Sequence, residues 1–170
     1  MIAFQQLLPG AYKADLVRLL LLYVYGGVYI DVGLTLALPL KDIIGEHELV
    51  LAEDLGLRLY HGGHLGIYNA FMASIPKHPY IRECIDMIVY KIHNLDYGMS
   101  CWDITGPHIM GSVFKKYYPL EEGIYDKGKI KIVSFKKFGK EDIFFEDQLT
   151  INGKNQQYKN IDGKFVLQMS

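Results

Sequence analysis

Three charged residues have the types and spacing that suit chemistry on a polar ligand: Asp15, Arg18 and Asp31. Asp15 and Arg18 are three positions apart in an apolar run, so a helix would hold both on one face at the edge of a core. Asp31 follows the β-rich residues 28–30 and should lie at the carboxyl end of a strand, where open α/β sheets bind ligands. A carboxylate there can hold a divalent cation that bridges a diphosphate.

The pair formed by Asp15 and Arg18 also has a purely structural interpretation. Opposite charges three residues apart form an ion pair on a helix, and a carboxylate near the start of a helix is stabilised by the helix dipole. The position of Asp31 favours ligand binding, because it adds a carboxylate at the edge of the sheet where ligands bind. From the residues alone, both interpretations stay open.

The elements that position these residues are a buried helix and the strand that follows it. Residues 11–25 contain few helix breakers, and Gly26 and Gly27 then end the helix before the strand at 28–31. The other predicted elements are a strand at 49–53, a strand within 66–74, a helix at 79–95, a helix introduced by 105–107, and short strands near 129–134 and 165–167. The order predicts an α/β fold in a single domain over residues 1–170.

Composition excludes several classes of function. Half of the 170 residues are hydrophobic and 22% are charged, which is typical of a globular protein. The net charge of -1 disfavours nucleic acid as a partner, because nucleic-acid binding normally needs a basic face. The most apolar run, residues 16–25, is about half the length of a membrane span and contains Arg18. With no leader peptide visible, the default expectation is a cytoplasmic location.

The segment around the charged residues resembles a known family. Ala14, Asp15 and Arg18 match an A-D-x-x-R helix, and Tyr25 to Asp31 match a Y-G-G-x-Y sequence followed by the first acid of a D-x-D motif. This order and spacing resemble glycosyltransferase family 32, the sugar transferases with a DXD motif that are related to fungal α-1,6-mannosyltransferases and clostridial glucosylating toxins. Residues 67–79 resemble the N-x-F-x-A-S-x-P-x-H-P stretch of that family, and residues 105–107 resemble its T-G-P element.

The resemblance implies a GT-A-like fold and a retaining transfer of a hexose from a UDP- or GDP-sugar to a hydroxyl of a glycan or glycoconjugate, as in polysaccharide biosynthesis. It implies catalytic roles for Asp15, Arg18 and Asp31, with Asp31 also a ligand of a divalent metal, expected to be Mn²⁺. The residues that we expect to bind substrate are Tyr29, Gly26, Gly27, Asp54, Asn69, Thr105, Gly106 and His108. No residue is an obvious covalent nucleophile, so the departing phosphate oxygen is expected to deprotonate the acceptor.

Two departures from the family pattern leave alternatives open. The second acidic position of the D-x-D motif is Gly33, which has no side chain to bind a metal. Family members also have a strand-containing segment before the A-D-x-x-R helix, so we expect the fold to lack part of the N-terminal nucleotide-binding unit. The alternatives to an active transferase are a non-catalytic protein that binds a sugar nucleotide or a glycan, and a subunit of a glycosylation complex.

Overall fold

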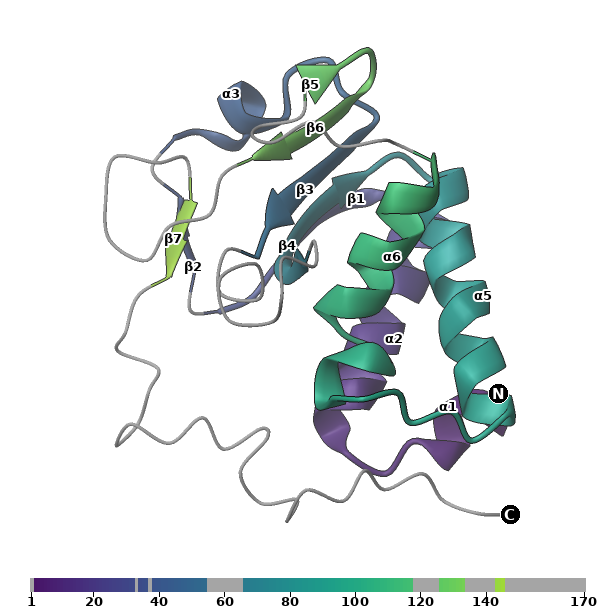
Figure 1. Ribbon diagram of the computed structural model, residues 1–170. Coiled ribbons are helices and arrows are strands. Elements are labelled where there is room, and N and C mark those ends of the chain that lie inside the picture. Colours follow the sequence, from purple (N-terminus) through teal and green to yellow (C-terminus); the bar gives the residue numbers. More distant parts are fainter. Residues whose placement is uncertain are drawn as a thin grey trace.

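Figure 1 shows the computed structural model of the chain, which describes residues 2–32, 34–36, 38–54, 66–117, 126–133 and 143–145. A five-stranded sheet with the order β1-β4-β3-β6-β5 forms its centre. Its strands are β1 (Gly27–Ile30), β3 (Leu49–Glu53), β4 (Ile67–Ser74), β5 (Asp126–Lys127) and β6 (Ile130–Val133). A smaller sheet pairs β2 (Leu34–Leu36) with β7 (Ile143–Phe145).

The directions of the strands decide which chain segments meet at one edge of the sheet. Both β1 and β3 run antiparallel to β4, which lies between them, so β1 and β3 are parallel to each other. Strand β6 is parallel to β3. The carboxyl ends of β1 and β3 therefore point to the same edge as the start of β4.

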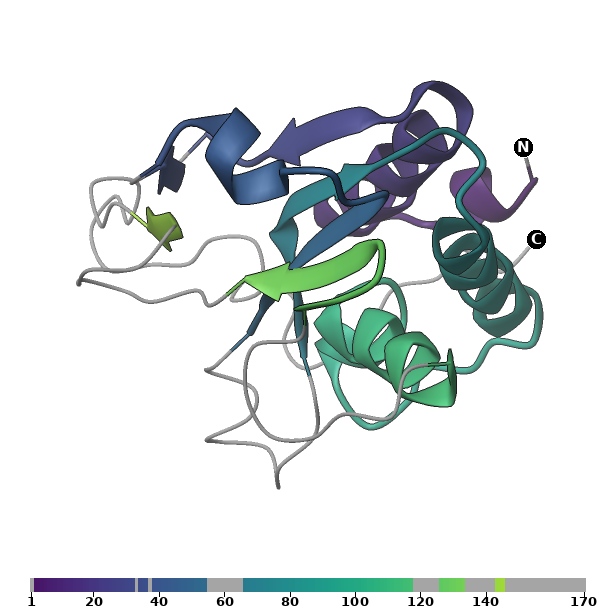
Figure 2. The ribbon, with the colours of Figure 1, turned by 90° about the horizontal axis from the view of Figure 1, so that it is seen from above.

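Helices cover both faces of this sheet. One core joins Leu49 and Leu51 of β3 to α1 (Ile2–Gln6), α2 (Gly10–Tyr25), α5 (Pro79–His93) and α6 (Pro107–Tyr117). The alternate residues Val50 and Ala52 face a second core under the short helix α3 (Leu40–Ile44), which Figure 2 shows across the sheet from α6. Every residue of β3 is buried, because both faces of the strand are covered.

The α/β class is confirmed, and the main elements begin and end within two or three residues of their predicted bounds. The short helices α1 and α3, the strand β2 and the 3₁₀ turn η1 (Cys101–Asp103) were not predicted. The strand expected near 165–167 lies outside the described residues, as does Gly33. Within the described ranges, no helix combines the length and the apolar character that a membrane crossing requires.

Gly26 forms the sharp connection between α2 and β1. Its φ is 66°, and its N–H donates to the carbonyl of Leu22 as the helix cap. A Cβ atom built on Gly26 would lie 2.7 Å from Cδ of Pro76 and 2.9 Å from the carbonyl oxygen of Ser74. Both the backbone conformation and the available space therefore require glycine at this position.

Replacing Gly26 with alanine is expected to lower the free energy of unfolding by about 2 kcal/mol or more, since strain and a clash add together. Gly27→Ala is the matched control, because Gly27 also has a positive φ, of 98°, but nothing lies within 4 Å of the added Cβ. Urea denaturation of both variants measures the difference. Equal losses would show that the close approach to Pro76 has no energetic weight.

Candidate functional site

Helix α2 holds Asp15 and Arg18 against the sheet instead of in solvent. Its core-facing residues Leu16, Leu19 and Leu22 are at most 3% exposed and fix the rotation of the helix. That rotation leaves Asp15 only 3% exposed and Arg18 only 8% exposed. Burying a charged pair costs free energy unless hydrogen bonds satisfy its polar atoms, so the partners of these two groups define the site.

The Asp15 carboxylate accepts hydrogen bonds from residues far away in the sequence. Asn69 donates from Nδ2 to Oδ1 at 2.8 Å, and the Thr105 hydroxyl donates to Oδ2 at 2.8 Å. A guanidinium nitrogen of Arg18 lies 3.2 Å from Oδ1. Strand β4, the start of α6 and helix α2 are thereby joined at one carboxylate.

Arg18 extends this cluster to the end of β1. One guanidinium nitrogen donates to the carbonyl oxygen of Asn69 at 2.6 Å and lies 3.5 Å from Oδ1 of Asp31. The guanidinium also lies over the ring of Tyr29, 4.5 Å from its centre. The positive charge is thus shared between a buried carboxylate and a more exposed one.

Asp31 is the part of the cluster that faces solvent. Its side chain is 37% exposed, and the hydrogen bonds it accepts from described residues, from Tyr29 at 2.6 Å and from Arg18, all go to Oδ1. Burial, with the hydrogen bond to Asp31 as the next cause, raises the pKa of Tyr29 to about 12, so the phenol stays protonated as a donor. Among the described residues no hydrogen bond reaches Oδ2 of Asp31, so this is the oxygen to which a ligand could bind.

An irregularity in β4 places Asn69 beside helix α2. Leu51 of β3 pairs with Met72, whereas the next residue, Ala52, pairs with Tyr68, so the register shifts between them. A bulge bends a strand and redirects its side chains. This bend aims the Asn69 amide at Asp15 while its carbonyl receives Arg18.

Asp54 lies at the same edge of the sheet as Asp31, because β1 and β3 run in the same direction on either side of β4. Asp54 directly follows β3, and its N–H donates to the carbonyl oxygen of Gly66 at 2.8 Å. The hydroxyl of Tyr68 is affected by both acids. Burial is the main cause that raises its pKa, and the negative charges of Asp54 and Asp31 raise it further. Sequence reasoning assigned no role to Tyr68, although its place beside Asn69 in a strand puts it on the opposite face of the same edge.

Three of the predicted site residues are glycines, which contribute through the backbone. Gly26 and Gly27 are at the opposite end of β1 from Asp31, where they form the connection from α2. Gly106 packs against the backbone of Trp102, because an added Cβ would lie 3.2 Å from its Cα. Gly26 and Gly27 therefore lie away from Asp15, whereas Gly106 directly follows Thr105, whose hydroxyl bonds Asp15.

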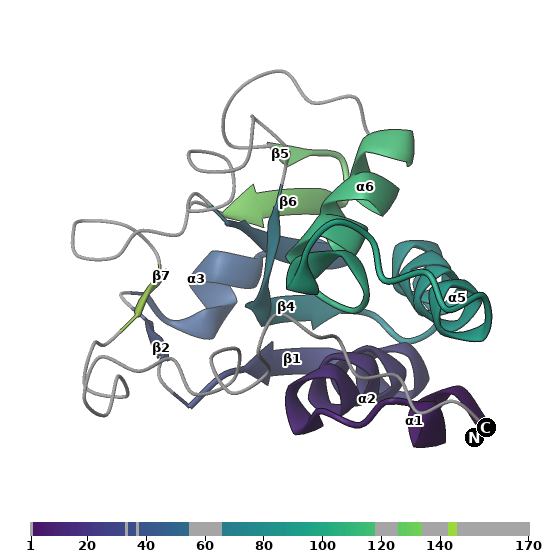
Figure 3. The same ribbon diagram turned by 60° about the horizontal axis from the view of Figure 1, so that its bottom comes forward.

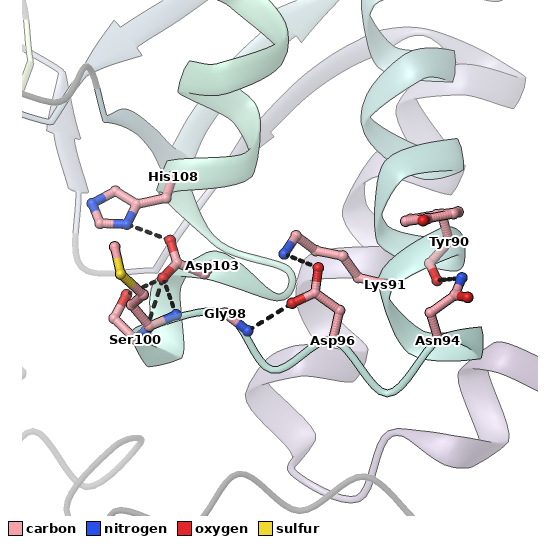
Figure 4. Close-up of polar contacts among 9 residues, drawn as sticks. Tyr90, Lys91, Asn94, Asp96, Gly98, Ser100, Asp103 and His108 are labelled. Atoms are coloured by element: carbon pink, nitrogen blue, oxygen red, sulfur yellow. Dashed lines mark hydrogen bonds and ion pairs between the residues drawn. The ribbon is translucent and has the colours of Figure 1, made fainter.

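His108 pairs with Asp103 at the start of α6, as Figure 4 shows. The two side chains are 2.7 Å apart, and Oδ2 of Asp103 also accepts from the backbone N–H groups of Met99 and Ser100. Burial raises the pKa of Asp103, but the hydrogen bonds from His108, Met99 and Ser100 outweigh it and hold the pKa below its usual value. Asp103 and Ser100 together form the capping box of η1, two residues before Thr105.

The buried Asp15 predicts a pH dependence of stability. Burial raises its pKa to about 7, against the lowering effects of Arg18 and of the Thr105 hydrogen bond. Between about pH 4 and pH 7 the folded protein holds a proton that the unfolded chain has released, so stability falls as the pH rises through this window. The slope is at most about 1.4 kcal/mol per pH unit.

Asp15→Asn is expected to remove this slope, and urea denaturation at several pH values between 4 and 8 measures it. Asp86→Asn is the control, since Asp86 is 54% exposed and pairs with Arg82 on the surface of α5. If the free energies of unfolding of the wild type and Asp15→Asn differed by the same amount at every pH, the raised pKa of Asp15 would be contradicted.

The side chains of the site can be compared with the ligands that a divalent metal prefers. Within the described ranges, no group of three His, Cys, Asp or Glu side chains could hold an ion. Magnesium-like ions in phosphate sites often take one or two protein carboxylates and complete their shell with phosphate oxygens and water. Asp31, with Oδ2 available at the edge of the sheet, fits that mode of binding as a single protein ligand.

Part of the chain matches a known protein family. Residues 2–50 match a family model described as the glycosyltransferase sugar-binding region containing a DXD motif. The match includes Asp15, Arg18, Tyr29 and Asp31. A search of curated proteins found no match to the chain.

One solved structure, titled PaToxG Glycosyltransferase, shares the fold. The TM-score is 0.50 at 19% sequence identity, and the aligned part covers 64% of this chain and 36% of that chain. The chain thus corresponds to little more than a third of that structure. At this identity the likeness concerns the fold alone.

Proposed function

Since residues 2–50 match the sugar-binding region of the DXD-motif glycosyltransferases, we propose that the chain transfers a hexose from a nucleotide-sugar to a hydroxyl group. The observation that carries the proposal is the buried cluster in which Asp15, Arg18 and Asn69 meet beside Asp31. In this cluster a partly exposed carboxylate lies next to a buried carboxylate and a guanidinium. Such a set suits a ligand that has hydroxyls at one end and phosphates at the other.

In this proposal the buried part of the cluster holds the sugar. The ionised carboxylate of Asp15 accepts bonds from sugar hydroxyls, and Asn69 and Thr105 fix its orientation through their bonds at 2.8 Å. Groups held by fixed donors need little rearrangement when the ligand binds, which favours affinity. Burial raises the pKa of Asp15 to about 7, so sugar binding should strengthen as the pH rises through 7 and the carboxylate ionises.

The exposed part of the cluster faces the diphosphate. Arg18 is held by Asn69 and Asp31 and brings a positive charge towards the leaving group, where negative charge develops as the C1–O bond breaks. When a divalent cation is bound, Asp31 would be its protein ligand, and the cation would neutralise the same charge. The phenol of Tyr29, kept protonated, orients Asp31 for this task.

The proposal also includes the stereochemistry, the donor and the acceptor of the reaction. We infer retention at the anomeric carbon, with the departing phosphate oxygen taking the proton of the acceptor hydroxyl as the new glycosidic bond forms. The donor would be a UDP- or GDP-hexose, and the acceptor a glycan or glycoconjugate. In the same proposal Asp54, at the shared edge of the sheet, contacts the nucleotide part, and His108 contacts the acceptor.

A second candidate function is donor binding without turnover. Gly33 in the second acidic position favours it, because the metal would lose a carboxylate ligand. The two functions make different predictions for hydrolysis, and a single experiment separates them.

The experiment measures binding and hydrolysis of UDP- and GDP-sugars, with and without Mn²⁺, for the wild type and for Asp31→Asn. A transferase is expected to release the nucleoside diphosphate with one donor, and Asp31→Asn should lower that rate about 100-fold. Binding without release would support the second candidate. Neither binding nor release with any donor would contradict both.

A further inference from the structure

Tyr12 has a buried hydroxyl that the function proposed above does not use. The side chain lies on α2, one turn before Asp15, and is 2% exposed within the core of the protein. Among the described residues, no group forms a hydrogen bond with its hydroxyl oxygen, which is itself buried. Buried polar atoms nearly always have a hydrogen-bond partner, because leaving one without a partner costs free energy. The hydroxyl of Tyr12 is therefore a group whose partner a ligand can supply.

This hydroxyl lies at the buried end of the cluster around Asp15. Residues three positions apart share one face of a helix, and Tyr12 and Asp15 are both buried on the core side of α2. Burial first, and then the negative charges of Cys101 and Asp15, raise the pKa of the Tyr12 hydroxyl, so both groups act on it. Figure 3 shows the first turns of α2 beside the segment that leads into α6, where Thr105 donates to Asp15.

The end of the cluster next to Tyr12 is close to the surface of the molecule. All three residues of η1 are partly exposed, although Thr105, two residues later, is fully buried. Ala14, the neighbour of Asp15 in α2, is exposed. A hexose is therefore not required to pass through the hydrophobic core to reach the hydroxyl of Tyr12.

Tyr12 and Asp15 offer complementary partners to a single hydroxyl group. An ionised carboxylate only accepts hydrogen bonds, whereas the phenol of Tyr12, which its raised pKa keeps protonated, donates one. A sugar hydroxyl both donates and accepts, so it can donate to Asp15 while it accepts from Tyr12. An ionised phosphate only accepts hydrogen bonds and an apolar group forms none, so neither would use both partners. Water has the same capacity as a sugar hydroxyl, and the stability of a variant separates these two occupants.

We propose that Tyr12 is a further residue that binds the donor sugar, and that its phenol donates to the same hexose hydroxyl from which Asp15 accepts. This inference rests on the proposed function, because it needs a nucleotide-sugar at the cluster. The free energy that the phenol costs in the free protein is recovered when the sugar hydroxyl becomes its partner. Tyr12 thereby selects hexoses that carry a hydroxyl at one position of the ring over the corresponding deoxy sugars.

Tyr12→Phe tests the inference, because it removes the hydroxyl and keeps the ring. Calorimetric titration at pH 8 uses a panel of UDP- and GDP-hexoses, beginning with UDP-glucose and GDP-mannose. The donor that the wild type binds is expected to bind Tyr12→Phe about 10-fold more weakly, with no change for the matching nucleoside diphosphate. Of the singly deoxygenated analogues of that donor, one is expected to bind both proteins equally, because it lacks the hydroxyl that Tyr12 contacts.

Tyr80→Phe is the matched control. Tyr80 is also 2% exposed, but its hydroxyl donates to the carbonyl oxygen of Met110 at 2.9 Å. Tyr80→Phe should therefore lower the midpoint of urea denaturation and leave the affinity for the donor unchanged. Tyr12→Phe should not lower the midpoint, since the free protein loses no hydrogen bond.

The outcomes separate this inference from the function on which it rests. A wild type that binds none of the nucleotide-sugars would contradict the proposed function and this inference together. Equal affinity of the wild type and Tyr12→Phe for a donor would overturn this inference alone. A lower urea midpoint with unchanged affinity would assign the hydroxyl to an internal water molecule and overturn it. An equal loss of affinity for the donor and the nucleoside diphosphate would assign Tyr12 to the packing of α2, which would also overturn it.

Discussion

Replacing Asp15 with asparagine is expected to weaken binding of a nucleotide-sugar by about 100-fold and to leave the affinity for the nucleoside diphosphate within about three-fold. The variant keeps the shape of the side chain but removes the charge that accepts hydroxyls and pairs with Arg18. Because the carboxylate lies at the buried end of the cluster, its loss should affect the sugar and spare the diphosphate. Calorimetric titration with both ligands measures the two affinities.

The control for this prediction is Asp86→Asn, which removes a surface carboxylate from a similar ion pair on α5. It should change neither affinity. If Asp15→Asn lost affinity for both ligands equally, Asp15 would support the fold of the whole site instead of recognising the sugar. Unchanged affinity for both would remove Asp15 from the site.

Replacing Arg18 with lysine is expected to lower the rate of donor cleavage by about 10- to 100-fold although the charge is kept. The planar guanidinium contacts the Asn69 carbonyl, both Asp15 and Asp31, and the face of Tyr29. The compact ammonium of lysine cannot make all of these contacts at once. Steady-state hydrolysis of the donor measures the loss.

Arg82→Lys serves as the matched control, since Arg82 pairs with Asp86 on the exposed side of α5 and lies 5.9 Å from the ring of Tyr23. Exposed pairs of this kind contribute little, so no change in rate is expected. Full activity in Arg18→Lys would mean that charge alone, and not the geometry of the guanidinium, is what the site requires.

Much of the site could be predicted from the sequence because helix and strand periodicities are local. The spacing of Asp15 and Arg18 fixed their common helix face, and the position of Asp31 after a β-rich run fixed its place at a strand end. The shared edge of Asp31 and Asp54 was not predicted in this form, because β1 and β3 are parallel only through their antiparallel pairing with β4 between them.

The rest depends on contacts between distant segments. The bulge that aims Asn69 at Asp15 is a property of the β3 and β4 pairing and has no local signature. The bond between Thr105 and Asp15 joins residues 90 positions apart. The capping of η1 by Asp103 explains the position of His108, and a short turn of this kind is too brief to show a period.

The most direct test of the sugar-binding cluster is a titration of the ¹⁵N-labelled protein with nucleotide-sugars, followed by NMR at the side-chain amide of Asn69. That amide donates to Asp15 in the structure, so it reports on the carboxylate that is assigned to the sugar. We expect a saturable shift of the Asn69 amide with one nucleotide-sugar and a much smaller shift with the corresponding nucleoside diphosphate. Saturable shifts elsewhere in the protein, with the Asn69 amide unmoved by every donor, would contradict it.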